Sequence, residues 1–326
     1  MKHAPLKTDP IVKEIDKAIK VYLAKRNPTT LYDPARYLFQ SGGKRMRAVM
    51  TALSCALFEK NYKKSFPAAA AVELLHNFSL VHDDIMDNDD LRRGRETIHK
   101  KWNANVAILT GDLLHALAFK SLNGSPESVL PRVLDIFSDA YIGLVEGQAL
   151  DKEFEKRSDI KLPDYLKMIE LKTAGLFAAA AQIGAVVGKA DSKKEQALRD
   201  YGYYCGMAFQ IQDDLLDVIG DEATLGKDIC SDLMEGKKSY IALHCVQDKY
   251  GKDFLSVFQN VTDPDILKRV IEDFRKFIQK TGIQEKTEKA IAKYVQSAVQ
   301  SLDRIKDSSA KAQLVAIAHR AGQRKN

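Results

Sequence analysis

Apolar positions recur at helical spacing along most of the chain. Ile11, Ile15 and Ile19 follow one another at intervals of four residues, which places them on one face of a helix. Proline and glycine residues divide the chain beyond them into further segments of this kind, at 49–58, 104–122, 131–154, 163–188 and 193–220. The alternation of apolar and polar residues that is typical of β-strands is almost absent. The pattern therefore predicts an all-α fold.

Two short aspartate-rich motifs each lie at the end of an apolar helical segment. Both motifs read Asp-Asp-x-x-Asp. Because a helix has about 3.6 residues per turn, the first and last aspartates of each motif share one helix face. Two acidic faces of the same design suggest one cleft that is lined from both sides. The six aspartates are Asp83, Asp84 and Asp87 in the first motif and Asp213, Asp214 and Asp217 in the second.

Crowded carboxylates of this kind favour a divalent cation. Two unit charges about 4 Å apart repel by roughly 4 kcal/mol at an effective dielectric constant near 20, so a cation or open water must offset the cluster. Mg²⁺ suits such a site, because it binds one or two carboxylates and completes its coordination with water and phosphate oxygens. A solvated acidic turn would explain one motif alone. Two copies beside apolar helices favour a metal site.

Basic residues accompany the acidic motifs. The segment 42–47, Gly-Gly-Lys-Arg-Met-Arg, places backbone amides and three cations at the start of a helix, where an anion is favoured. Each cation alone could be a surface residue, but metals and cations together, without a protein nucleophile, suit a reaction in which diphosphate leaves. An apolar pocket could then hold the carbocation. The cations in question are Lys44, Arg47, Arg92, Arg93, Lys172, Lys227 and Lys237.

His76 lies seven residues before Asp83, two turns away on the same helix face. One interpretation is a core histidine whose polar atoms are satisfied. The other is a hydrogen-bond donor to a phosphate. A role as general base is less convincing, since no serine, cysteine or carboxylate partner is placed for it nearby in the sequence.

Composition narrows the class of protein further. The chain has 326 residues, 45% of them hydrophobic, and no repeat or low-complexity linker, so residues 1–326 are expected to form one domain. The net charge of +6 is spread along the chain, without the basic block interleaved with aromatic residues that would indicate nucleic-acid binding. The four cysteines form no Cys-x-x-Cys pair, which is typical of reduced thiols inside cells.

Nothing in the sequence predicts an export signal or an integral membrane segment. The first residues lack the apolar stretch of a signal peptide. The longest apolar run, 174–188, is interrupted by Gln182 and is shorter than the roughly 18 to 20 residues needed to span a bilayer. The sequence therefore predicts a cytoplasmic protein.

Taken together, the motifs resemble those of the trans-isoprenyl diphosphate synthases, the polyprenyl synthetase family. The resemblance covers roughly 40–239, in the family's order. It implies an all-α bundle of about ten core helices around a central cavity, usually as a homodimer. The motifs are GGKRMR (42–47), DDIMD (83–87) with RRG (92–94), GD (111–112), EGQALD (146–151), KT (172–173), FQIQDDLLDVIGD (209–221), GKD (226–228) and GKKS (236–239).

The resemblance implies a site for an allylic diphosphate such as dimethylallyl, geranyl or farnesyl diphosphate. In it, Asp83, Asp87 and Asp213 would bind three Mg²⁺ ions, with Mn²⁺ as an alternative metal. These ions would grip the diphosphate while it leaves. The other residues of this site would be Asp84, Asp214, Asp217, Arg92, Lys172, Lys227 and Lys237.

A second site would hold isopentenyl diphosphate. Thr173 and Gln210 would stabilise the developing carbocation by their dipoles. The reaction would proceed by ionisation, condensation at the isopentenyl double bond, and proton loss. Gln148 and Asp151 would line the cleft. The diphosphate of isopentenyl diphosphate would be bound by Lys44, Arg47, His76 and Arg93.

The length of the product would depend on residues below the first motif. Phe78 lies five residues before Asp83, about 7.5 Å back along the helix, and is followed by the small Ser79. An aromatic residue there, without an insertion in the motif, resembles archaeal geranylgeranyl diphosphate synthases and implies a twenty-carbon product. Farnesyl diphosphate is the alternative, since a large residue elsewhere could stop growth sooner. Phe78 could also be an ordinary packing residue.

Three other classes of protein remain as alternatives. A terpene cyclase also carries an aspartate-rich helix, but it would not need a second diphosphate site, which segment 42–47, His76 and Arg93 would form. A non-catalytic partner subunit of a heteromeric synthase typically lacks one aspartate motif, whereas both are intact here. A helical scaffold without a ligand would leave the paired motifs unexplained.

Overall fold

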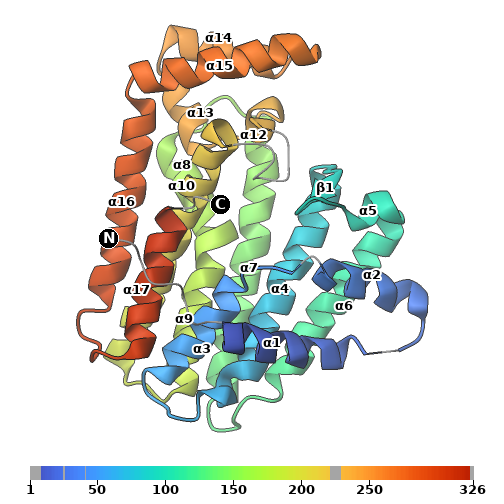
Figure 1. The fold of residues 1–326 in the computed structure, drawn as a ribbon, viewed down its shortest axis with the longest axis vertical. Helices are drawn as coiled ribbons and strands as arrows, with labels where there is room; N and C mark the ends of the chain where they lie inside the picture. The colour runs from blue at the N-terminus through green and yellow to red at the C-terminus, as the bar shows by residue number, and fades with distance from the viewer. Residues whose placement is uncertain (1–8, 25, 41, 221–228, 324–326) are drawn as a thin grey trace.

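The structure is a computed structural model that describes residues 9–24, 26–40, 42–220 and 229–323 (Figure 1). Within these ranges helices and the loops between them make up the chain, apart from one short hairpin of β1 (Leu91–Arg92) and β2 (Arg95–Glu96). The predicted all-α fold is therefore confirmed. The segment predicted as one helix at 163–188 is divided, because a π-helical turn interrupts it.

Helices follow one another with short connections. In the first half of the chain they are α1 (Asp9–Tyr22), α2 (Thr29–Gln40), α3 (Met46–Ala56), the 3₁₀ turn η1 (Tyr62–Ser65), α4 (Phe66–Met86), α5 (Ile98–Lys101), α6 (Ala104–Leu122) and α7 (Leu130–Glu155). In the second half they are α8 (Leu162–Ile169), the π turn η2 (Glu170–Ala174), α9 (Gly175–Val187), α10 (Ser192–Ile219), α12 (Ser231–Met234), α13 (Tyr240–Cys245), α14 (Lys249–Phe258), α15 (Pro264–Lys280), α16 (Ile283–Ser301) and α17 (Ser309–Gly322).

The long helices α4, α6, α7, α9 and α10 form the centre of the molecule (Figure 1). α9 is apolar on all sides and almost completely buried, as expected of a central helix. Small residues let its neighbours approach closely. A Cβ atom on Gly184 would lie 2.2 Å from the carbonyl oxygen of Thr51 in α3, and one on Gly202 in α10 would lie 2.3 Å from that of Phe177. These contacts place α3 and α10 directly against α9.

By length and composition alone, one segment of the described chain could cross a membrane, namely Leu162–Val187. It consists of α8, η2 and α9, and 78% of its most apolar window is buried inside the protein. An apolar helix packed by protein on nearly all sides is a core helix. The segment therefore carries no indication of a membrane span.

Candidate functional site

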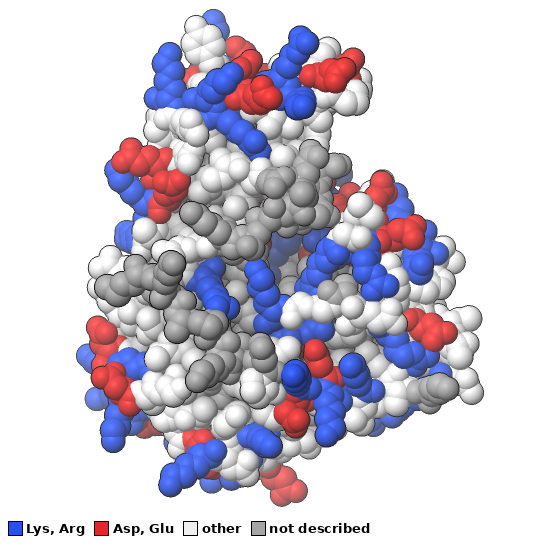
Figure 2. Space-filling view, in the orientation of Figure 1, with Lys and Arg blue, Asp and Glu red and all other residues white. Residues whose placement is uncertain are grey.

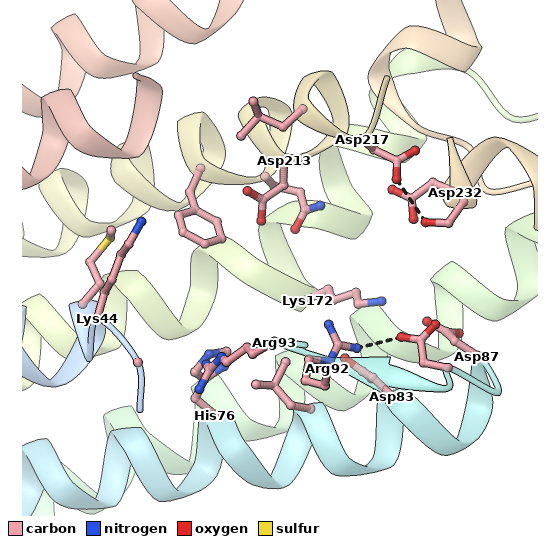
Figure 3. Close-up of a pocket in the computed structure, with 18 of the residues that line it drawn as sticks. Lys44, His76, Asp83, Asp87, Arg92, Arg93, Lys172, Asp213, Asp217 and Asp232 are labelled. Carbon is pink, nitrogen blue, oxygen red and sulfur yellow. Dashed lines mark hydrogen bonds and ion pairs between the residues drawn. The ribbon is translucent and has the colours of Figure 1, made fainter. Parts of the chain in front are cut away.

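The two aspartate motifs face each other across one cavity of about 550 Å³. Asp83 and Asp87 lie at the C-terminal end of α4, and Asp213 and Asp217 lie on α10 on the opposite wall (Figure 3). The prediction of a single cleft lined from both sides agrees with this arrangement. Carboxylates at the C-terminus of α4 also meet the negative end of the helix dipole, which increases the need for a cation.

The middle aspartate of each motif points away from the cavity and is buried. Arg92 Nε donates to Asp84 Oδ1 at 2.7 Å. Asp214 accepts hydrogen bonds from the Tyr165 hydroxyl at 2.7 Å and from the Tyr240 backbone amide at 2.8 Å. Burial raises the pKa of Asp84 to about 6 despite Arg92, and burial together with Asp232 raises the pKa of Asp214 to about 7. These two carboxylates therefore position neighbouring side chains.

Lysines neutralise the carboxylates that face the cavity. Asp87 Oδ2 pairs with Lys237 Nζ at 2.9 Å, and its Oδ1 pairs with Lys152 Nζ at 3.1 Å. Burial alone would raise the pKa of Asp87, but these lysines hold it below the ordinary value. For Asp83, burial and the neighbouring charge of Asp87 outweigh the charges of Lys172 and Arg92, so its pKa is raised. Buried carboxylates that repel one another in this way favour the binding of a cation.

The donor set of the cavity fits Mg²⁺. Its carboxylates supply the oxygen ligands that this ion prefers, and they come from both walls. In the part of the chain that the structure describes, no three histidine, cysteine or carboxylate side chains converge closely enough to hold a metal ion alone. Mg²⁺ in proteins usually uses one or two carboxylates and takes its remaining ligands from water and phosphate. Asp83, Asp87 and Asp213 are placed to supply the protein ligands.

A tight hairpin brings two arginines to the mouth of the cavity. The strands β1 and β2 are joined by Arg93 and Gly94, whose φ angles of 57° and 71° correspond to a two-residue turn of type I′. Arg92 on β1 bonds to Asp84 and, at 2.9 Å, to Asp89. Arg93 Nη1 donates to the Gly42 carbonyl at 2.8 Å. The hairpin therefore links the first aspartate motif to the glycine-rich segment 42–47.

The glycine-rich segment turns sharply before α3 begins. Gly42 and Gly43 have φ angles of 68° and 146°, and a Cβ atom on Gly43 would lie 3.0 Å from Arg93 Nη1. Of the three cations predicted to meet an anion here, Arg45 is buried and pairs with Asp16 at 2.9 Å and Glu73 at 3.0 Å. It therefore anchors the loop.

The other cations of the segment, Lys44 and Arg47, lie on the cavity wall, and Lys and Arg side chains gather around a hollow in the space-filling view (Figure 2). The Arg47 guanidinium lies 4.1 Å from the ring centroid of Phe177, and its Nη1 lies 3.1 Å from His76 Nε2. Because arginine can only donate, Nε2 accepts and the imidazole proton is assigned to Nδ1. Burial and Arg47 hold the pKa of His76 well below its ordinary value. Neutral His76 on the cavity wall fits the phosphate-donor interpretation better than that of a core histidine.

The Lys-Thr motif lies within the π turn η2, and turns of this kind are frequent at functional sites. Lys172 Nζ donates to Asp151 Oδ2 at 2.5 Å. Thr173 Oγ1 donates to Gln210 Oε1 at 2.8 Å, which joins η2 to α10. Gln148 Nε2 lies 3.6 Å from Met86 Sδ, while its buried Oε1 has no partner. Lys172 lines the same cavity as the aspartates.

Two further lysines bear on the expectation drawn from the sequence. Lys227, expected at the diphosphate, lies outside the described residues. Lys152 was missed by sequence reasoning, although it directly follows Asp151 at the end of the EGQALD motif. Helical spacing could have found it, since it lies four residues after Gln148 on the same helix.

A deeper cavity of about 140 Å³ adjoins the first and shares Asp83, Lys172 and Gln210 with it. Leu80, Leu144, Leu176 and Phe209 supply its apolar wall, whereas the remainder of its lining, including Ser79, is polar or charged. A cavity with both a charged and an apolar wall suits a molecule with a charged head and a hydrocarbon tail.

Phe78 does not line this deeper cavity. Its ring packs behind the wall, 4.7 Å from the ring of His82, 5.6 Å from that of His115 and 5.6 Å from that of Tyr141. This aromatic cluster of Phe78, His82, His115 and Tyr141 joins α4, α6 and α7. Ser79, whose hydroxyl donates to the His76 carbonyl, is the residue of the pair that meets the cavity.

The close crossing of α7 and η2 gives a testable prediction. A Cβ atom on Gly147 would lie 2.3 Å from the backbone nitrogen of Lys172, so Gly147→Ala must push η2 away from α7. We expect a loss of about 1–3 kcal/mol in stability and a fall in kcat/KM, because Lys172 is displaced. Gly143→Ala is the matched control, since its Cβ would meet only Leu171 at 3.5 Å. Thermal melts and steady-state kinetics would test this, and equal behaviour of the two variants would contradict it.

Comparison with known proteins agrees with this geometry. The family model of polyprenyl synthetase matches residues 28–274. A geranylgeranyl diphosphate synthase of Sulfolobus acidocaldarius is 38% identical over 314 residues, covering 92% of this chain and 91% of the relative. A geranylfarnesyl diphosphate synthase of Natronomonas pharaonis is 40% identical over 248 residues, covering 71% and 73%. The crystal structure of geranylgeranyl pyrophosphate synthetase from Pyrococcus horikoshii superposes with a TM-score of 0.90 at 35% identity, covering 98% of each chain.

The match covers most of the chain and includes both aspartate motifs. The chain belongs to the polyprenyl synthetase family. It is an enzyme, a prenyltransferase, and both the predicted family and the predicted reaction class are confirmed.

Proposed function

We propose that this enzyme condenses isopentenyl diphosphate with allylic diphosphates and releases geranylgeranyl diphosphate. One observation carries the proposal. The cavity holds two groups of cations, one around the aspartates and one formed by Lys44, Arg47 and Arg93 beside neutral His76, and it adjoins a second cavity with an apolar wall. Two diphosphates and one growing hydrocarbon chain require these three features.

The allylic diphosphate would bind between α4 and α10. Mg²⁺ held by Asp83, Asp87 and Asp213 would neutralise charge on the departing diphosphate. Lys237, which pairs with Asp87, and Lys172, which pairs with Asp151, would exchange those contacts for phosphate oxygens. Each positive group then faces the negative charge that develops as the carbon–oxygen bond breaks.

Isopentenyl diphosphate would bind at the other group of cations. Lys44, Arg47 and Arg93 would hold its diphosphate, and His76 would donate from Nδ1. The hydroxyl oxygen of Thr173, held by Gln210, would face the developing carbocation with its lone pairs. The apolar wall excludes water, which would otherwise capture the cation.

A product assay tests the proposal. Purified protein, labelled isopentenyl diphosphate and Mg²⁺ would be incubated with dimethylallyl, geranyl or farnesyl diphosphate, and the dephosphorylated products sized by chromatography. A twenty-carbon alcohol from all three primers is expected. Products that stop at fifteen carbons would identify a farnesyl diphosphate synthase. Products longer than twenty carbons would show that the residues that limit chain growth lie farther from the aspartates. Absence of condensation with every primer would favour a non-catalytic partner subunit.

We further propose that the enzyme is a homodimer that uses the exposed faces of α6 and α7. Ile108 and Leu109 on α6 are 44% and 57% exposed, and Ile142 and Val145 on α7 are 56% and 47% exposed. His115 and Tyr141, with ring centroids 4.8 Å apart, hold the two helices together. A contiguous apolar face of this kind is typical of a two-fold interface.

Charge on this face should dissociate the dimer. Leu109→Glu or Ile142→Glu places each new carboxylate in the interface twice, because of the two-fold symmetry, and should cost several kcal/mol, about 2–4 per site. Light scattering after gel filtration should give the mass of one chain for both variants and of two for the parent. Val21→Glu on α1, where Val21 is 63% exposed, is the control and should leave the mass unchanged. A parent protein with the mass of one chain would refute the proposal.

Residues 1–326 are proposed to form one domain that works in the cytoplasm. α10 supports the first part, since Leu198 and Tyr201 belong to the apolar core around α4 and α9, while Ile211 and Leu215 belong to the core around α13 and α16. One rigid helix therefore links both cores. The four cysteines are buried, which suits a compartment where thiols stay reduced.

A further inference from the structure

Asp87 has a lysine on each carboxylate oxygen. Lys237 Nζ lies 2.9 Å from Oδ2, and Lys152 Nζ lies 3.1 Å from Oδ1. The Asp87 side chain is only 7% exposed, so water cannot replace these contacts. Any cation that binds Asp87 therefore competes with an ammonium group on each oxygen. Lys237 comes from the GKKS motif, whereas Lys152 comes from α7 and plays no part in the reaction derived above.

Both lysines have a second carboxylate within reach. Lys237 Nζ lies 2.8 Å from Glu235 Oε2, and Lys152 Nζ lies 2.5 Å from Glu155 Oε1, one helical turn away on α7. Breaking a buried ion pair is costly when it leaves one charge alone. Here Lys152 can leave Asp87 and remain paired with Glu155. The Lys152 side chain is 32% exposed, so it also has room to move toward solvent.

We propose that Lys152 is an internal competitor for the metal at Asp87, with Glu155 as its resting partner once a metal has bound. The pair sets how tightly the first aspartate motif binds a divalent cation. In the free enzyme, Lys152 keeps the buried carboxylate neutralised, which stabilises the end of α4. This inference depends on the assignment of Asp87 as a metal ligand in the proposed function.

Replacement of Lys152 should strengthen the binding of a divalent metal, whereas replacement of a residue near a binding site usually weakens it. Lys152→Met keeps the length of the side chain and removes the competing charge. The apparent dissociation constant for a divalent metal should fall by about three- to tenfold, the size expected for losing one partly exposed ion pair. Lys156→Met is the matched control, because Lys156 is exposed at the end of the same helix and changes the net charge equally. Its effect should stay within about twofold.

Mn²⁺ provides a direct readout without catalysis. Full-length protein with inorganic diphosphate would be titrated with Mn²⁺, and the free ion followed by electron paramagnetic resonance. Wild type, Lys152→Met and Lys156→Met would be compared at one ionic strength. Tighter binding by Lys152→Met alone supports the proposal. Equal affinities of Lys152→Met and Lys156→Met would overturn it while leaving the metal assignment intact. Failure of the wild type to bind Mn²⁺ would overturn the metal assignment and this inference with it.

Glu155→Gln tests the resting partner. Without Glu155, Lys152 has only Asp87, so metal binding should weaken by about three- to tenfold. In the Lys152→Met background the same change should have little effect, because no lysine remains to be redirected. If Glu155→Gln weakened Mn²⁺ binding equally in both backgrounds, Glu155 would act only as a distant charge. That result would overturn the proposed exchange.

Discussion

Asp83→Asn and Asp213→Asn are each expected to lower kcat/KM for condensation by about 10²- to 10⁴-fold. The substitution keeps the size of the side chain and removes the charge that would hold a metal against the departing diphosphate. A thousandfold loss corresponds to about 4 kcal/mol of transition-state stabilisation. Both residues line the same cavity from opposite walls. Loss at either wall should therefore be severe even though the other wall is intact.

The control lies in the same acidic run. Asp90 has a side chain that is 79% exposed and pairs with Lys100 at 2.8 Å on the surface. Asp90→Asn should leave turnover within about twofold, because an exposed ion pair contributes little. Turnover would be measured with farnesyl and isopentenyl diphosphates, and circular dichroism would confirm the helical content of each variant. Near-normal turnover of Asp83→Asn would refute the metal assignment.

Helical spacing predicted how the two aspartate motifs are arranged. The two aspartate motifs lie on α4 and α10 and face one cavity because helical periodicity decides which aspartates share a face. The same rule explains why Asp84 and Asp214 point away from the cavity and into the protein, since each is rotated about the helix axis by about 100° from the aspartate before it. The cations around them were predicted from residue type and order along the chain, and Lys44 and Arg47 do lie on the cavity wall.

Other features depend on contacts between distant parts of the chain. The π turn that presents Lys172 and Thr173 lies inside a segment whose apolar pattern reads as one continuous helix. Arg45 looks like an anion-binding residue until its two partners, Asp16 on α1 and Glu73 on α4, are known. Such pairings join residues far apart in the sequence, and periodicity holds no information about them. For Lys152, helical spacing could predict the partner Glu155 on the same helix but not the partner Asp87 at the end of α4.

Substitutions at Phe78 and Ser79 should change the length of the product in opposite directions. Phe78→Ala removes a ring from the aromatic cluster behind the deeper cavity, so the chain gains room to grow beyond twenty carbons. One further isoprene unit buries five carbons, worth about 4 kcal/mol at roughly 0.8 kcal/mol per methylene group, which favours another addition. Ser79→Phe instead fills the cavity that Ser79 lines, and growth should stop at about fifteen carbons, because overpacking at that depth is unfavourable.

The pair of variants separates a role in product length from a role in packing. Both would be assayed with labelled isopentenyl diphosphate and with either farnesyl or dimethylallyl diphosphate as primer, with product sizes read by chromatography and stability by thermal melting. Ser79→Phe should fail to extend farnesyl diphosphate while still extending dimethylallyl diphosphate, which shows that the catalytic groups are intact. If Phe78→Ala lowered the melting temperature but still gave a twenty-carbon product, Phe78 would be a packing residue only. The product length would then be limited by the residues that line the cavity directly, Leu144 and Leu176 among them.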